Sequence, residues 1–229
     1  MRTKLDVQVS QEDDSISTGG EVPPIAFGPI PSRRLGKSLG INNIPPKVCT
    51  YSCLYCQVGP TMDRSTEPRA YYPPDRIAEE IAAHVEAVRS QGEAIDPLTF
   101  APDGEPTLDT GLGESIQLLR PLGIPIAVIS NGSLLWRPEV RERLETADWV
   151  SVKVDSAIES IWRKVDRPHP DLDLDTVLDG IRQFETEFEG ELVSETMLID
   201  GINDGPESIA SVGEFLRELG PVSYTHLRA

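Results

Sequence analysis

The stretch Ser38-Leu-Gly-Ile-Asn-Asn-Ile-Pro-Pro-Lys-Val-Cys49-Thr-Tyr-Ser-Cys53-Leu-Tyr-Cys56 joins a short predicted strand, residues 38–44, to a loop that holds every cysteine of the chain. An odd number of thiols cannot all pair in disulfides, and three crowded thiolates repel one another unless a cation holds them. A disulfide role is also disfavoured because nothing resembling a secretory signal precedes the loop. The loop is therefore predicted to bind a metal.

The order of the elements beyond this loop predicts the fold class. Strands are expected at residues 97–101, 124–130, 149–155 and 192–199, and helices at 75–90, 112–119, 138–146, 174–188 and 209–219. Residues 23–37 are expected to be irregular, and a further strand is expected after Gly220. Strands that alternate with helices indicate parallel βα units with right-handed crossovers, and hence an α/β protein.

The number of thiols narrows the choice of metal. Soft thiolates select zinc, copper(I) or an iron–sulfur cluster. Structural zinc normally takes four protein ligands, and His84, His169 and His226 are the only histidines that could complete a Cys3His set. His84 lies in a predicted helix and His169 between two prolines, where a structural role is the simpler interpretation. Three thiolates on a four-iron cluster would instead leave one iron open to a ligand that is not protein.

Polar residues follow or end three later strands, at the edge of a parallel barrel where chemistry gathers. Phe100-Ala-Pro-Asp-Gly-Glu-Pro-Thr-Leu108 follows one strand, and Asn131, after the next, either binds a ligand or forms the turn that an Asn-Gly pair favours. In Trp149-Val-Ser-Val-Lys-Val-Asp155, alternation places the valines on the helix-packed face and Ser151, Lys153 and Asp155 on the inner face. Lys153 and Asp155 either pair with each other or serve the reaction.

The cysteine spacing resembles the signature of the radical S-adenosylmethionine (SAM) enzymes. That signature is Cys-x3-Cys-x2-Cys, usually with an aromatic residue before the last cysteine, as Tyr55 is here. The resemblance implies that Cys49, Cys53 and Cys56 hold a [4Fe–4S] cluster whose open iron chelates SAM. Reductive cleavage of SAM would then give a 5′-deoxyadenosyl radical that abstracts hydrogen from a substrate. The implied fold is an incomplete (β/α)6 barrel.

The other motifs take their roles from the same resemblance. Asp103-Gly104-Glu105-Pro106 resembles the Gly-Gly-Glu-Pro motif that holds the SAM amino group, with Asp103 in place of the first glycine. Lys153 and Asp155 become catalytic candidates that contact the SAM ribose or the substrate. The expected cofactor-binding residues are Tyr55, Asp103, Gly104, Glu105, Pro106, Asn131 and Ser151.

Longer strings, such as residues 28–36 and 162–169, resemble a stand-alone prokaryotic subgroup of iron–sulfur oxidoreductases related to the wyosine-forming tRNA enzymes. Those tRNA enzymes use extra cysteines for a second cluster and a lysine that engages pyruvate. The extra cysteines are absent from this sequence, and Lys153 would be the candidate lysine. The resemblance leaves the substrate unidentified and implies an external electron donor, flavodoxin or ferredoxin. Alternative functions are tRNA modification, activation of a partner protein by a radical, and a non-catalytic metal- or cluster-binding module.

Charge and composition limit the partners and the domain organisation. The formal charge is −17, and residues 71–229 carry 13 basic against 31 acidic side chains, which disfavours tRNA binding. We expect a mobile tail over residues 1–22, a radical SAM domain over 23–220, and a non-native tail over 221–229 that leaves the last strand missing or corrupted. No stretch is apolar enough to cross a membrane, so we expect a cytoplasmic protein, and a monomer.

Overall fold

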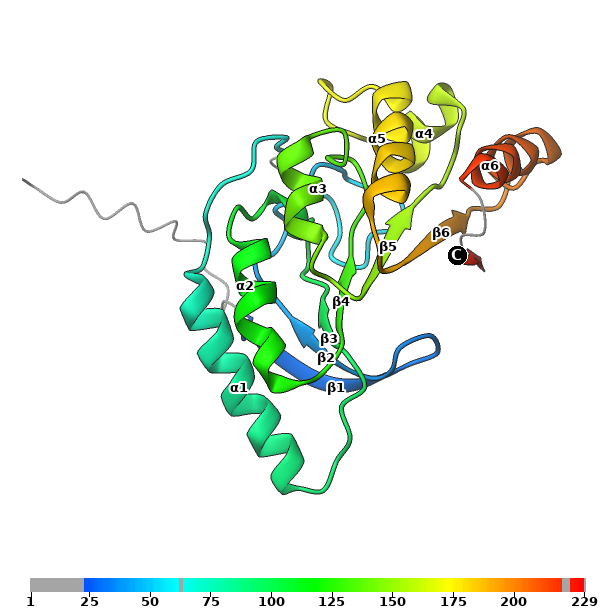
Figure 1. The fold of residues 1–229 in the computed structure, drawn as a ribbon. Coiled ribbons are helices and arrows are strands. Elements are labelled where there is room, and N and C mark those ends of the chain that lie inside the picture. The colour runs from blue at the N-terminus through cyan, green and yellow to red at the C-terminus, as the bar shows by residue number, and fades with distance from the viewer. Residues whose placement is uncertain (1–22, 62–63, 220–222, 229) are drawn as a thin grey trace, which may run out of the picture.

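A curved, mainly parallel sheet with helices along its outer side forms the fold (Figure 1). The computed structural model describes residues 23–61, 64–219 and 223–228. Strands β2 to β7 are parallel and neighbour one another in chain order, whereas β1 runs antiparallel to β2 at one edge. The strands are β1 Ala26–Ser32, β2 Gly36–Ile41, β3 Leu98–Phe100, β4 Ile126–Ile129, β5 Trp149–Lys153, β6 Glu191–Leu198 and β7 Ser223–Arg228. The predicted α/β class and incomplete barrel are confirmed.

Helices that connect the parallel strands bury one apolar stripe each. In α1, the buried residues Ile77, Ile81, Val85 and Val88 recur at helical spacing. Helix α5 begins at Asp173, whose carboxylate accepts a hydrogen bond from the backbone N–H of Thr176 at 3.0 Å. The helices are α1 Pro74–Ser90, α2 Leu112–Leu119, α3 Pro138–Leu144, α4 Glu159–Val165, α5 Leu174–Glu187 and α6 Pro206–Glu218, with 3₁₀ turns η1 Pro106–Leu108 and η2 Arg120–Leu122.

Two elements differ from the sequence-based expectation. The segment expected to be irregular contains β1, which pairs on one side only and therefore tolerates Pro29 and Pro31 without a backbone donor. Helix α4, of which Trp162 and Val165 are buried, was not expected, although the equally short α3 was. Helix α3 begins with Pro138, which marks a helix start, whereas α4 has neither a proline nor a capping side chain at its start.

The C-terminal segment also corrects the expectation. Residues 223–228 form β7, which pairs in parallel with β6 from Val193↔Ser223 onward, so the last strand is not missing, and its corruption stays a prediction. Residues 1–22, 220–222 and 229 lie outside the described residues. The division into an N-terminal tail, a domain and a non-native C-terminal tail stays a prediction.

Strand β5 shows how the sheet separates its two faces. Val150, Val152 and Val154 are buried in the main core, which also contains Ile181 of α5. The alternation of a strand therefore places Lys153 on the inner face, beside its register partner Glu195 of β6. In the part of the chain that the structure describes, no helix combines the length and the apolar character needed to cross a membrane.

The loop after β3 contains a buried acid with a pH-dependent effect on stability. Asp109 is fully buried and accepts hydrogen bonds from the Gly111 N–H (2.9 Å) and Asn43 Nδ2 (3.1 Å). Burial, the dominant cause, raises the pKa of Asp109 from 3.8 to about 6. The folded state therefore favours the protonated acid, and the stability that this provides is lost as the pH rises through 6.

We expect Asp109→Asn to remove this pH dependence, because the amide stays neutral. Between pH 5 and 7.5, wild-type unfolding free energy should fall relative to the variant by on the order of 1 kcal/mol. Thermal unfolding at both pH values measures the difference, with Asp75→Asn in the exposed first turn of α1 as a control. A difference between Asp109→Asn and wild type that does not change with pH would contradict the prediction.

Candidate functional site

A cavity of about 310 Å³ brings the cysteine loop together with the carboxyl ends of β3, β4 and β5. Of the twelve residues expected at a site, nine line it, whereas Pro106, Ser151 and Asp155 do not. The lining residues are Lys47, Cys49, Cys53, Tyr55, Cys56, Gln57, Val58, Gly59, Thr61, Ala101, Pro102, Asp103, Gly104, Glu105, Ile129, Ser130, Asn131 and Lys153.

Backbone hydrogen bonds hold the cysteine loop from two sides. On one side, the Glu105 N–H donates to the Val48 carbonyl at 2.9 Å. On the other, the Ser52 N–H donates to the Asp166 carbonyl at 3.0 Å and the Leu54 N–H to the Val165 carbonyl at 2.8 Å. The loop is thus fixed between the turn after β3 and the end of α4.

The surroundings of Cys49 and Cys53 disfavour free thiolates. Burial raises the pKa of Cys49 to about 12, and the nearby Glu105 carboxylate adds to the effect. The pKa of Cys53 is raised by burial and then by Asp166, whose carboxylate lies 3.4 Å from the Cys53 Sγ. Metal ligation requires thiolates, so a bound cation would have to supply the charge that stabilises them.

The donor set fits an iron–sulfur cluster better than zinc. Three sulfurs reach one cavity, which leaves room for a ligand that is not protein. Within residues 23–61, 64–219 and 223–228, no three Cys, His, Asp or Glu side chains are already arranged as a metal-ion site. The histidines give zinc no support: His84 contacts the Gly28 carbonyl at 2.9 Å, and His169 accepts from the Asp171 N–H at 3.2 Å. The side chain of His226 lies outside those described.

Gly104 allows the turn after β3 to pack directly on the cysteine loop. A Cβ at this position would lie 2.2 Å from the Val48 carbonyl oxygen. The backbone carbonyl of the neighbouring Asp103 accepts a hydrogen bond from the Lys47 N–H at 2.7 Å, and Asp103 keeps a negative φ. The aspartate in place of the usual first glycine is therefore compatible with the backbone of this turn.

Glu105 connects the ends of β3 and β4. Its side chain is 1% exposed, and Oε1 accepts from the Thr107 N–H (3.1 Å), the Thr107 hydroxyl (2.6 Å) and the Ser130 hydroxyl (2.7 Å). Oε2 accepts from the Asn131 N–H at 2.7 Å. Burial raises the pKa of Glu105 despite these donors. The carboxylate thus builds the turn, and a ligand ammonium would meet the backbone around Gly104 more readily than this side chain.

Asn131 and Ser151 take different positions. The Asn131 Oδ1 accepts from the Ser133 N–H at 3.0 Å, which forms the expected turn, while its Nδ2 donates to the Thr50 hydroxyl at 2.7 Å and lies 3.6 Å from the Cys49 Sγ. Asn131 therefore both forms the turn and faces the cysteines. Ser151 is fully buried away from the cavity, and its hydroxyl has no partner among the described residues.

Lys153 and Asp155 do not pair with each other, so that sequence-based alternative is wrong. The Lys153 Nζ lies 3.3 Å from Glu195 Oε2 and 5.2 Å from the centre of the Tyr55 ring. Asp155 accepts from the Tyr55 hydroxyl and, at 2.6 Å, from the Met197 N–H. Asp155 thus touches the cavity only through Tyr55.

Sequence reasoning did not identify Glu195 and Asp166 as residues close to the cysteine cavity. Both are buried charged residues, at 5% and 2% exposure. An acidic residue inside the predicted strand at 192–199 could have drawn attention to Glu195. Burial and the negative charge of Asp155 raise the pKa of Asp166.

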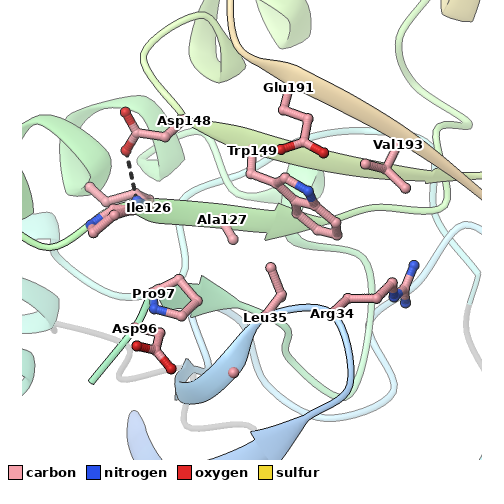
Figure 2. Close-up of a pocket in the computed structure, with 12 residues that line it drawn as sticks. Arg34, Leu35, Asp96, Pro97, Ile126, Ala127, Asp148, Trp149, Glu191 and Val193 are labelled. Atoms are coloured by element: carbon pink, nitrogen blue, oxygen red, sulfur yellow. Dashed lines mark hydrogen bonds between the residues drawn. The ribbon is translucent and has the colours of Figure 1, made fainter. Parts of the chain in front are cut away.

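A second and larger cavity, about 570 Å³, lies at the opposite end of the sheet. Figure 2 shows it between the β1–β2 hairpin, with Arg34 and Leu35, and the first residues of β4 and β5, including Trp149. No cysteine lines it. The chemistry that the thiols can support therefore belongs to the smaller cavity.

Comparison with known proteins identifies the family. Residues 43–212 match the family model described as the radical SAM superfamily. A UPF0026 protein of Methanocaldococcus jannaschii is 50% identical over 197 residues, covering 86% of this chain but 61% of that protein, so the chain spans about three fifths of that relative.

Solved structures agree in fold. TYW1 with a lysine–pyruvate adduct bound has a TM-score of 0.57 at 18% identity, covering 78% of this chain and 61% of that one. SuiB of Streptococcus suis bound to SAM has a TM-score of 0.55 at 12% identity, covering 81% and 38%. Because the family match includes the three cysteines and the turn after β3, the chain belongs to the radical SAM superfamily, whose enzymes use a [4Fe–4S] cluster and SAM.

Proposed function

We propose that this chain holds a [4Fe–4S] cluster through Cys49, Cys53 and Cys56 and cleaves SAM reductively, in order to abstract hydrogen from a substrate. The observation that carries the proposal is that all three thiols open into one cavity with the turn after β3 and Lys153. When bound, the cluster and SAM supply a 5′-deoxyadenosyl radical, while the protein contributes binding, orientation and exclusion of side reactions.

The residues around the thiols divide these tasks. Asp103 and Gly104 present a backbone edge beside the cysteine loop, where the amino group of SAM would find carbonyl acceptors. Tyr55 and Asn131 form further walls of the cavity and are held by Asp155 and Thr50 respectively. Lys153 contributes a cation on the substrate side. Ser151 and Pro106, which lie away from the cavity, would act through the positions of their neighbours.

Enzymes of this superfamily generally need a reductant. We infer a low-potential electron donor such as flavodoxin or ferredoxin for this protein. The cysteine loop offers a route, because the Leu54 side chain is 39% exposed between Cys53 and Cys56. A donor docked over Leu54 would lie beside the segment that carries Cys53 and Cys56.

A second candidate function is tRNA modification. The observation in its favour is that Lys153 lines the cavity in a fold shared with TYW1, which has been solved with a lysine–pyruvate adduct. Against this function, the Lys153 Nζ is already engaged with Glu195 at 3.3 Å and lies over the Tyr55 ring. The charge of −17 also opposes binding to RNA. Hydrogen abstraction from a smaller substrate therefore fits the site better.

Anaerobic reconstitution followed by reduction tests the reaction. We expect 5′-deoxyadenosine to form from SAM only when iron and sulfide have been incorporated, and chromatography of the quenched reaction measures it. A folded, iron-loaded protein that neither binds nor cleaves SAM would contradict the proposal and favour a non-catalytic module. Cleavage that rises only when tRNA is added would indicate tRNA modification. Cleavage that rises only when a partner protein is added would indicate activation of that partner.

A further inference from the structure

Three charged side chains meet on the inner face of the sheet. Lys153 of β5 and Glu195 of β6 are register partners, so their side chains leave the sheet on the same face. The Lys153 Nζ contacts Glu195 Oε2 at 3.3 Å, and the Arg34 guanidinium contacts Glu195 Oε1. One buried carboxylate is therefore shared between two cations, one on each oxygen.

The β1–β2 hairpin holds Arg34 in this position. The Ser32 hydroxyl accepts hydrogen bonds from the backbone N–H groups of Arg34 (3.4 Å) and Leu35 (3.2 Å). The guanidinium lies over Trp149, with its carbon 5.9 Å from the ring centre, and Figure 2 shows both side chains at the larger cavity. Arg34 thus reaches Glu195 from the end of the sheet opposite to the cysteines.

The sharing of Glu195 leaves one positive charge uncancelled. Arg34 lines only the larger cavity and Lys153 only the smaller one, so the surplus charge is presented beside the thiols. Asp166 also lies within electrostatic reach of Lys153, but among the described ion pairs Lys153 contacts only Glu195, and Asp155 accepts hydrogen bonds from Tyr55 and Met197. An anion that enters the smaller cavity therefore meets an ammonium that its own partner does not neutralise.

We propose that Lys153 binds an anionic group, a carboxylate or a phosphate, of a ligand in the smaller cavity, and that Arg34 acts as a positioning residue that keeps Glu195 from cancelling the Lys153 charge. This proposal rests on the proposed function only in taking the smaller cavity as the reaction site. The anionic group belongs to the substrate.

The arrangement predicts that replacing Arg34 and replacing Glu195, which contact each other, change anion binding in opposite directions. Arg34→Met leaves Glu195 to neutralise Lys153, so anion binding should weaken by about tenfold. Glu195→Gln removes the competing carboxylate, so anion binding should stay the same or tighten. Lys153→Met should lose the binding. A merely structural ion cluster would instead weaken binding in both the Arg34 and the Glu195 variants.

The affinity of each variant for an anion is measured by titration calorimetry of the cluster-loaded, unreduced protein with inorganic phosphate, with and without saturating SAM. Arg34→Lys keeps the charge and should retain most of the binding that Arg34→Met loses. Phosphate that binds alongside SAM assigns the anion to the substrate. Phosphate that SAM displaces, together with weaker SAM binding in Lys153→Met, would mean that Lys153 contacts SAM and would overturn the assignment to a substrate. Lys47→Met removes another lysine that lines the same cavity, and its phosphate binding is compared with that of Lys153→Met.

Phosphate binding that Lys153→Met leaves unchanged, or that Arg34→Met and Glu195→Gln weaken equally, would overturn the proposal. Circular dichroism of each variant shows whether it is folded, and Arg34→Lys supplies the charge test if Arg34→Met is not. SAM cleavage by the wild-type protein is scored separately. Cleavage without Lys153-dependent phosphate binding refutes the anion site alone, whereas Lys153-dependent binding without cleavage supports the site and refutes the proposed reaction.

Discussion

Replacement of Cys53 by alanine should abolish both cluster assembly and SAM cleavage. Cys53 is the middle one of the three proposed ligands, and the chain has no cysteine other than Cys49, Cys53 and Cys56 to replace it. Two remaining thiolates cannot hold a cluster that needs three. We expect iron content and the visible absorption of the cluster to fall to background, and 5′-deoxyadenosine formation with them.

The control for this variant is Ser90→Ala, an exposed residue at the end of α1. It should retain the iron and the activity of the wild-type protein. Circular dichroism must show that Cys53→Ala is folded, because its thiol contacts the buried Asp166. Retained cleavage of SAM by a folded Cys53→Ala protein would refute the assignment of the cluster ligands.

Gly104→Ala should destabilise the protein and displace the cysteine loop. The added Cβ would lie 2.2 Å from the carbonyl oxygen of Val48, a backbone atom that cannot move without shifting the loop that follows it. We expect a loss of unfolding free energy of about 3 kcal/mol or more, and poor iron incorporation. Denaturant unfolding and iron analysis of the purified variant measure both effects.

Gly213→Ala is the matched control, because it makes the same substitution in the interior of α6. A Cβ there meets nothing within 4 Å, and alanine favours a helix over glycine by about 1 kcal/mol. This variant should be as stable as the wild type or slightly more so. Equal stability of Gly104→Ala and Gly213→Ala would show that the turn after β3 does not depend on close packing against the cysteine loop.

The sequence predicted the repeated elements and the cysteine loop because their signals are local. Buried residues such as Ile77 and Ile81 recur at helical spacing, and the buried apolar residues of β4 and β5 fall in strands that the sequence placed within a few residues. The thiols could be recognised from their number and spacing alone. In contrast, β1 escaped prediction because its prolines are typical of an irregular segment, and α4 because no proline or capping side chain marks its start.

What only the tertiary structure decided is which charged groups meet. Alternation along β5 placed Lys153 and Asp155 on the inner face, but their partners come from distant parts of the chain: Glu195 lies 42 residues after Lys153, and Tyr55 lies 100 residues before Asp155. Arg34 reaches Glu195 across 161 residues of sequence. Such contacts depend on strand register and on the hairpin that crosses the sheet end, and no local pattern encodes them. The sequence by itself predicted the proposed cluster ligands and the family to which the chain belongs, because cysteine number and spacing are local, whereas the folded sheet determined the charge that a ligand would meet beside them.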